Sequence, residues 1–233
     1  MESDVFGSAW RGIASCQDCC IRDAALFGHL SDADFAFIHR PIDERRIAAG
    51  GALYHAGDAG DAVFTVRRGL IKLTRLRSDG TQRIVRLLGP GASVGLETTL
   101  GQPYAHTAIA LQNTEVCRIP KSVIETLDES VPDFHRHLMR RWADAVDSAD
   151  SWLTDLATGS ARQRLARLLL QLGEAEGEAL LLARGDLAAI LGITTEHASR
   201  TVSEFKSKGV IAQIKAAHYR IDVVKLKAIA EAD

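Results

Sequence analysis

Residues 184–209 read RGDLAAILGITTEHASRTVSEFKSKG, and this stretch decides the fold of the C-terminal part of the chain. It predicts a short helix that ends at Gly192, because glycine is the usual left-handed stop of a helix. Thr194 is a good N-cap for a second helix, and Gly209 is a good stop for it. Two short helices joined by a tight turn that contains glycine are typical of a helix-turn-helix.

The second helix of this stretch has an apolar face and a polar face. Ala198, Val202 and Phe205 recur at helical spacing and predict a buried stripe. In a helix-turn-helix the start of the second helix meets base edges, where Glu accepts from cytosine and Arg donates twice to guanine. The candidate DNA-binding residues are therefore Thr194, Glu196, His197, Ser199 and Arg200. A purely structural alternative is an ion pair between Glu196 and Arg200, worth about 0.2–0.5 kcal/mol.

A hairpin and a local excess of positive charge follow the two helices. Residues 210–212 and 219–221 predict the two strands of a wing, with Lys215 and His218 near its turn. Residues 184–220 carry six Lys or Arg against three acids, a charge of +3. The remaining residues then carry −5, because the whole chain has a net charge of −2. A basic patch on an acidic protein favours double-stranded DNA as the partner.

Residues 131–158 show the periodicity of one long helix. Apolar side chains recur at steps of three and four, and the opposite face is charged. Such a stripe fits two structures: a helix packed on its own domain, or a two-stranded coiled coil between subunits of a homodimer. The candidate dimer-interface residues are Phe134, Leu138, Trp142, Ala145, Ala149 and Trp152.

Upstream of this helix, residues 26–130 predict β-structure. Short apolar runs at 53–54, 62–66, 70–74 and 84–88 are separated by glycine and Asp-Gly turns. Many short strands at regular spacing favour a sandwich or barrel over a parallel sheet.

Composition narrows the class of protein. Apolar residues make up 46% and charged residues 25% of the 233 residues, which excludes a disordered chain. No run approaches the roughly 18 apolar residues of a membrane span. Because residues 1–4 are acidic and no apolar segment follows them, we expect no secretory signal, no membrane partner and a cytoplasmic location. Cys16, Cys19 and Cys20 crowd together, which in a reducing compartment indicates metal or redox chemistry.

Taken together, these motifs resemble the Crp/Fnr superfamily of bacterial transcription regulators. The residues that carry the resemblance are the glycine-rich β-region, Val94-Gly95-Leu96-Glu97, Val116-Cys117-Arg118-Ile119-Pro120, the long helix, Arg184-Gly185-Asp186, the Leu191-Gly192-Ile193-Thr194 turn and Glu196-x-x-Ser199-Arg200. The last pattern is typical of the oxygen-responsive Fnr branch, whose members bind a TTGAT-type half-site, so the resemblance implies a response to oxygen or redox state. The resemblance implies a homodimer on a palindromic operator, with RNA polymerase as a further partner.

The resemblance also implies an α+β fold with four parts. A cysteine-containing arm at 1–25 precedes an antiparallel β-roll sensor at 26–130, which is a double-stranded β-helix of the cyclic-nucleotide-binding type. A dimerisation helix at 131–158 and a winged helix-turn-helix at 159–233 complete the chain. The cyclic-nucleotide branch of the family binds the phosphate with a cassette that corresponds to residues 95–107 here, and this stretch contains no Arg or Lys. A buried cyclic phosphate needs a cationic partner, so cAMP is disfavoured as the effector.

The Fnr branch holds a [4Fe–4S] cluster with three N-terminal cysteines and one from the β-roll. Cys16 and Cys19 match the first pair and Cys117 matches the distal ligand. The family spacing places the third ligand at Ala25, whereas this chain has Cys20 instead. The candidate ligands are therefore Cys16, Cys19, Cys20 and Cys117, with Asp18, Asp23 or His29 as a possible non-cysteine substitute.

Alternatives to a cluster remain at this point. The cysteines could form a thiol switch without any cofactor, or they could be inert. A haem or a small molecule could be sensed instead, with His29, His55 or His106 as a ligand. Enzymatic readings are weak, because a cupin-like barrel would need a His-x-His set and a dithiol oxidoreductase a βαβ unit, and neither is found. We therefore expect no catalytic activity.

Overall fold

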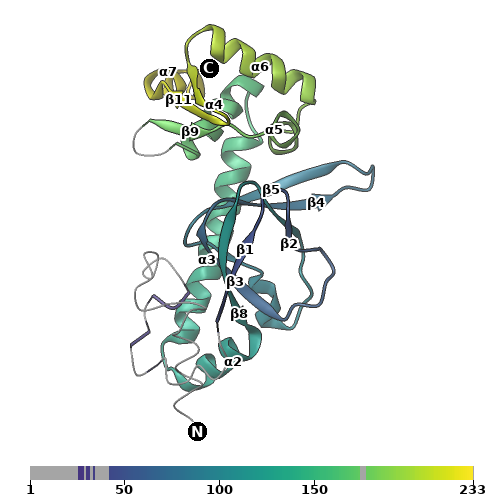
Figure 1. The fold of residues 1–233 in the computed structure, drawn as a ribbon, viewed down its shortest axis with the longest axis vertical. Coiled ribbons are helices and arrows are strands. Elements are labelled where there is room, and N and C mark those ends of the chain that lie inside the picture. Colours follow the sequence, from purple (N-terminus) through teal and green to yellow (C-terminus); the bar gives the residue numbers. More distant parts are fainter. Residues whose placement is uncertain (1–25, 29, 32–33, 35–41, 174–176, 233) are drawn as a thin grey trace. The chain divides into compact units, whose positions relative to one another are not determined.

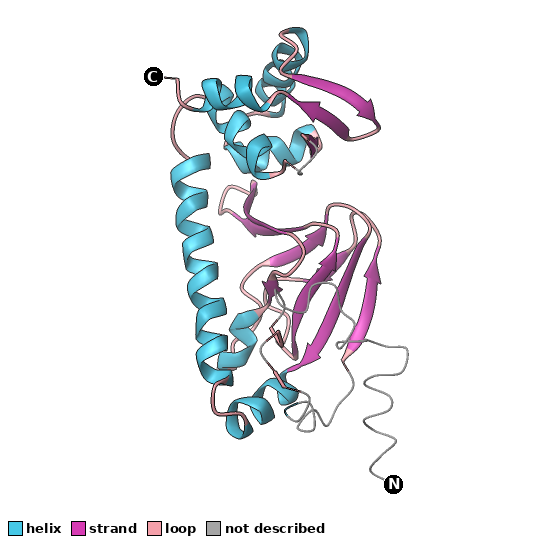
Figure 2. Ribbon diagram, turned by 90° about the vertical axis from the view of Figure 1, so that its left-hand side faces the viewer, coloured by secondary structure: helices cyan, strands magenta, loops and turns pink. Residues whose placement is uncertain are grey.

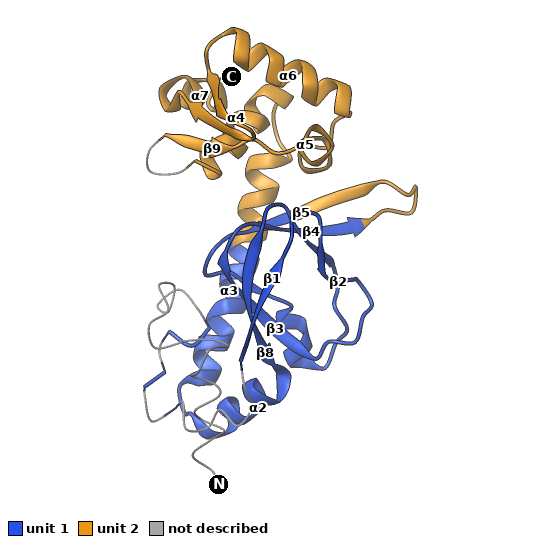
Figure 3. Cartoon of the chain, viewed as in Figure 1, with its two compact units in different colours: residues 1–75, 86–147 blue, residues 76–85, 148–233 orange. Residues whose placement is uncertain are grey.

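The computed structural model describes residues 26–28, 30–31, 34, 42–173 and 177–232. They form two compact units (Figure 3), one of residues 1–75 and 86–147 and the other of residues 76–85 and 148–233. The first is mainly β-structure and the second mainly helical (Figure 2). This α+β arrangement confirms the predicted fold class.

The β-roll is built from two antiparallel four-stranded sheets, as predicted for this part of the chain. One has the order β1-β8-β3-β6 and the other β2-β7-β4-β5. The strands are β1 (Asp43–Ile47), β2 (Ala52–Tyr54), β3 (Ala62–Arg68), β4 (Ile71–Leu76), β5 (Gln82–Leu88), β6 (Ser93–Val94), β7 (Thr107–Ala110) and β8 (Thr114–Pro120). The four predicted runs correspond to β2, β3, β4 and β5. The other strands became visible only through their pairing, since β1 and β7 find partners distant in sequence.

Between residues 42 and 130 the structure also has helical elements, in the region predicted as β-structure. The 3₁₀ helix η3 (Leu96–Leu100) follows β6. Helix α2 (Lys121–Ser130) follows β8 (Figure 1). Helix α2 buries Val123, Ile124 and Leu127 in the same apolar cluster as Val63 of β3 and residues of β8. Its apolar residues recur at helical spacing, and this signal was missed in the sequence because the run is short.

Helix α3 (Phe134–Leu156) is the predicted long helix, and its surroundings change along its length. Phe134 is fully buried and Leu138 nearly so, both in the core of the β-roll unit. Farther along, Met139, Val146 and Leu153 are about half exposed or more (48%, 56% and 62%). Leu156 at the end is buried again. The helix thus has a buried start, a buried end and an exposed apolar seam between them.

The second unit has the predicted helix-turn-helix and wing. It contains α4 (Ala161–Gln171), β9 (Glu178–Leu180), α5 (Arg184–Leu191), α6 (Thr195–Ser207), β10 (Ile211–Lys215), β11 (His218–Ile221) and α7 (Val223–Ala230). The predicted hairpin is β10–β11, and the sequence did not reveal that β9 joins it as a third strand. Gly159, with φ 83°, lies between α3 and α4. No helix among the described residues is both long and apolar enough to cross a membrane.

Candidate nucleic-acid interface and sensor site

The turn between α5 and α6 is fixed by local capping. Gly192 adopts the left-handed conformation at φ 66°, and its N–H donates to the carbonyl of Ala188. Thr194 caps α6, its hydroxyl accepting from the His197 N–H at 3.2 Å. A short rigid connection of this kind holds the start of α6 in one direction relative to α5.

The inner face of α6 is buried as the periodicity predicted. Ala198, Val202 and Phe205 are 0–1% exposed. Thr201 is also buried, and its hydroxyl donates to the carbonyl of His197 at 2.9 Å. This face therefore packs on the rest of the unit, and the orientation of α6 about its own axis is fixed.

The outer face of α6 carries the predicted DNA-binding residues. The side chains of Glu196 and Arg200 are 80% and 71% exposed, and their charged atoms lie 4.0 Å apart. His197 is exposed and Ser199 is half-buried. An exposed pair at this distance contributes little to stability, so the ion pair alone does not account for these residues. Both side chains are oriented so that they can contact a ligand outside the unit.

Basic side chains occur at the end of α6 and in the wing. Lys206 lies over the ring of Tyr219 in the wing, 4.8 Å from the ring centroid. At the wing turn, Lys215 and His218 flank Ala216, which has a positive φ of 29°. Tyr219 itself is buried, so the cation–π contact links the last part of α6 to the wing.

The predicted sensor residues fall partly outside the described part of the chain. Cys16, Cys19 and Cys20 lie there, as do Asp18, Asp23 and His29. Cys117 is described: it occupies β8, opposite Glu44 of β1 and Thr65 of β3. Among the described residues, no group of three or more His, Cys, Asp or Glu is placed to hold a metal ion. That search does not reach the N-terminal cysteines.

Cys117 is buried, at 9% exposure, in an apolar cluster that includes part of the N-terminal segment. Leu26, Phe27 and Leu30 belong to that cluster, together with Ile42 and residues of α2 and α3. Leu26, Phe27 and Leu30, which follow Cys20 by six to ten positions, therefore pack in the core that holds Cys117. The ring of Phe27 also lies 6.4 Å from that of Phe134 at the start of α3.

Two tyrosines that the sequence did not single out form a stack in the β-roll. The rings of Tyr54 and Tyr104 are 3.7 Å apart and nearly parallel, and Phe64 lies beside both. Burial, above all, raises the pKa of both hydroxyls, which therefore stay protonated at neutral pH. The Tyr104 hydroxyl donates to the carbonyl of Ala62 at 2.8 Å. Gly95 allows this arrangement, because a Cβ there would lie 2.7 Å from the Tyr104 ring.

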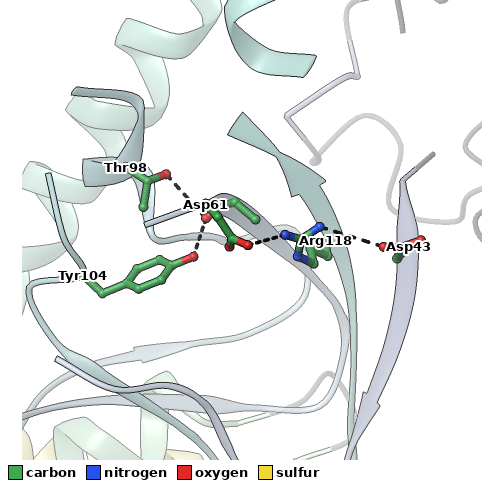
Figure 4. Close-up of polar contacts among 6 residues, drawn as sticks. Asp43, Asp61, Thr98, Tyr104 and Arg118 are labelled. Atoms are coloured by element: carbon green, nitrogen blue, oxygen red, sulfur yellow. Dashed lines mark hydrogen bonds and ion pairs between the residues drawn. The ribbon is translucent and has the colours of Figure 1, made fainter. Parts of the chain in front are cut away.

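Residues 95–107, the candidate cassette for a cyclic phosphate, are held by contacts within the chain. Glu97 accepts from the N–H of Ala105 at 2.9 Å. Thr98 donates to the carbonyl of Gly95 at 3.0 Å. It also donates to the carbonyl of Ala62 at 3.4 Å, the bond drawn from Thr98 in Figure 4. The nearby guanidinium of Arg118 pairs with Asp61 at 2.6 Å and with Asp43 at 3.9 Å. That cation is thus already matched by two carboxylates.

Three histidines were proposed as haem ligands, and the two that the structure describes are in different settings. His55 is exposed and lies 3.7 Å from Asp58. His106 is partly buried, and this burial lowers its pKa. Neither belongs to a group of metal-ligating side chains within the described residues.

Comparisons with known proteins agree with both halves of this description. Residues 44–130 match the model of the cyclic nucleotide-binding domain, and residues 163–232 that of the Crp-like helix-turn-helix domain. The chain is 31% identical to the transcriptional activator FnrL of Cereibacter sphaeroides, over 84% of each protein. It is 28% identical to the transcriptional activator anr of Pseudomonas aeruginosa, over 93% of each. FixK2 from Bradyrhizobium japonicum has a similar structure, with a TM-score of 0.74 at 24% identity, covering 82% of this chain and 98% of FixK2.

We expect cAMP not to bind, although the β-roll matches a cyclic nucleotide-binding domain. Residues 95–107 offer no cation to the phosphate, and burying that charge unpaired is costly. A ligand present at 100 times its Kd would raise the free energy of unfolding by about 2.7 kcal/mol. Thermal unfolding and titration calorimetry with cAMP should show no rise in Tm and no binding heat. A saturable rise in Tm would contradict the expectation.

Proposed function

The chain belongs to the Crp/Fnr family of transcription regulators, which are DNA-binding proteins and not enzymes, and we propose that it is a redox-responsive member that binds a TTGAT-type palindrome as a homodimer. The observation that carries this proposal is the outer face of α6. It presents an acid, a hydroxyl and a guanidinium from a helix whose opposite face is locked into the core. We further propose that it acts in the cytoplasm together with RNA polymerase.

In the proposed complex each residue of α6 has a distinct role. Glu196 accepts from a cytosine amino group, and Arg200 donates to the two acceptors of a guanine. Ser199 lies between them and contacts a base or a phosphate. Thr194 and His197 lie at the N-terminal end of the helix, where main-chain N–H groups and the helix dipole favour a phosphate.

Replacing Arg200 by Ala tests this recognition. We expect Arg200→Ala to weaken binding to a TTGAT-type palindrome by about 1–3 kcal/mol for each guanine that the side chain no longer binds, and to remove discrimination at that base pair. Fluorescence anisotropy at one fixed salt concentration, with guanine-substituted operators, measures both effects. Lys208→Ala is the matched control: it removes one charge from the C-terminal end of the same helix and should weaken all sequences alike. Undiminished selectivity in Arg200→Ala would refute the proposed readout.

The dimer is proposed to form through the exposed seam of α3. Met139, Val146 and Leu153 recur every seven residues, the spacing of one position in a coiled-coil heptad. Trp142, Ala145, Ala149 and Trp152, which the sequence analysis proposed, are partly exposed along the same helix. Phe134 and Leu138 are buried in their own subunit, so their side chains are not available to a partner. Dimerisation would place two copies of α6 about one DNA turn apart, roughly 34 Å.

A charge placed in the seam should separate the subunits. In the proposed dimer, Val146→Glu would bury a carboxylate against the same residue of the partner subunit. We therefore expect a monomer by analytical ultracentrifugation and loss of palindrome binding. Ser148→Glu is the control, because it adds the same charge on the opposite face of the same turn and should remain dimeric. Because the seam has no acid at Ala145 or Ala149, little charge repulsion opposes the dimer there. We therefore expect the unmodified protein to stay dimeric in air as well as without oxygen. A dimeric Val146→Glu protein would place the interface elsewhere.

An iron–sulfur cluster is the proposed sensor. The residues present fit such a group: Cys117 supplies a thiol in a core shared with Leu26, Phe27 and Leu30, six to ten positions after Cys20. Cys16, Cys19, Cys20 and Cys117 would hold it, which is the usual four-thiolate set. When bound, the cluster supplies a centre that oxidants can alter. Cys117 holds its position in an inner strand of a four-stranded sheet, and the contact of Phe27 with Phe134 would link the N-terminal segment to the start of α3.

Replacing Cys117 tests the cluster. We expect Cys117→Ser, purified without oxygen, to lose most of its iron and sulfide together with the broad visible absorption that such clusters give. Val116→Ala trims a buried neighbour in the same strand and should keep both, so it serves as the control for a perturbed core. Full iron content in Cys117→Ser would show that this thiol is no ligand.

The same measurement separates the other sensors. A parent protein without iron whose operator binding changes on oxidation would favour a thiol switch. A sharp Soret band would favour haem. Full cluster content in Cys20→Ala would place the third ligand at another residue, with Asp18, Asp23 and His29 as the candidates.

A further inference from the structure

Arg167 of α4 joins the end of α3 to the DNA-binding unit. Its Nη1 donates to the carbonyls of Asp155 and Thr158, each at 3.1 Å. Its Nε and Nη2 donate to the carbonyl of Ala230 at 3.2 and 2.9 Å. One half-buried guanidinium therefore contacts the C-terminal ends of two helices, α3 and α7.

The chemistry of these contacts favours arginine. The last carbonyls of a helix have no partner within it and carry partial negative charge, which a cation stabilises. A planar guanidinium can contact several carbonyls in fixed directions, whereas an ammonium is a compact point charge. A second side chain of α4 also contacts Asp155 at the end of α3, because Gln171 donates to its carboxylate at 2.9 Å.

Two neighbouring arginines of α4 contact the two helices of the helix-turn-helix. Arg164 donates to the carbonyl of Leu191, which ends α5. Arg162 pairs with Glu204 of α6 at 3.2 Å. Arg167 instead contacts Asp155 at the end of α3 and Thr158 in the junction, residues 157–160, that separates α3 from α4. Within the second unit, α4 thus contacts the end of α3 through Arg167, and it contacts α5 and α6 through Arg164 and Arg162.

We propose that Arg167 is a positioning residue that fixes the direction in which α6 is presented relative to α3. The proposal rests on the function proposed above, in which α3 joins two subunits on a palindrome. A single half-site needs only a correctly folded α6. Two half-sites at a set spacing also need a fixed relation between each α6 and the dimer helix. Loss of Arg167 should therefore affect the second requirement and spare the first.

The test measures how binding depends on the spacing of the half-sites. Fluorescence anisotropy is recorded with a single TTGAT half-site, with the palindrome, and with palindromes whose spacer is one or two base pairs longer or shorter. For Arg167→Ala we expect unchanged half-site affinity, about tenfold weaker binding to the palindrome, and a clearly smaller penalty for a changed spacer. Arg167→Lys, which keeps the charge but not the fork, should fall between Arg167→Ala and the parent.

Lys227→Ala is the matched control, because it removes an exposed cation from the last turn of α7, whose end Arg167 contacts, and leaves the arginines of α4 in place. It should keep the spacer dependence of the parent. Arg167→Ala with the parent's spacer dependence would overturn the proposal, as would loss of half-site affinity to the same extent as palindrome affinity. If Arg167→Ala does not fold, as judged by thermal unfolding, Arg167→Lys decides on the same two criteria. A parent protein that binds palindrome and half-site equally would instead refute the proposed function.

Discussion

Helix α3 is constrained to satisfy two cores at once, one at each of its ends, and the burial pattern along the helix follows from this. Its first residue, Phe134, fills the core of the β-roll unit, and its last, Leu156, is buried in the second unit. Between these anchors the helix leaves large apolar side chains in solvent. Exposed apolar side chains repeated along one helix face mark a surface for a partner. The unit that contains Cys117 and the unit that contains α6 are thus joined by one continuous stretch of helical backbone.

The parts of the fold that local chemistry specifies could be predicted from the sequence. Thr194, Gly192 and Gly209 mark the ends of α5 and α6 through capping, which depends only on near neighbours. The buried stripe of α6 followed from its period. By contrast, β1 and β9 are short, and partners distant in sequence hold them in place. No local signal announces such strands.

The site was only partly predictable, and the reasons are physical. Periodicity showed that α3 has an apolar stripe, but not which residues its own core would take and which would remain exposed. Phe134 and Val146 are both apolar residues of this helix, yet their exposure is opposite. The role of Arg167 depends on carbonyls at the ends of α3 and α7, which come together only in the folded unit. The same holds for the stack of Tyr54 on Tyr104.

The separation of the two faces of α6 has a consequence for how this regulator can change over time. Ala198, Val202 and Phe205 hold the helix in place, whereas Glu196 and Arg200 contribute almost nothing to the stability of the fold. Replacements on the outer face therefore carry little thermodynamic penalty. Under the readout proposed above, a lineage can explore new operator sequences through a handful of exposed positions while its scaffold stays intact.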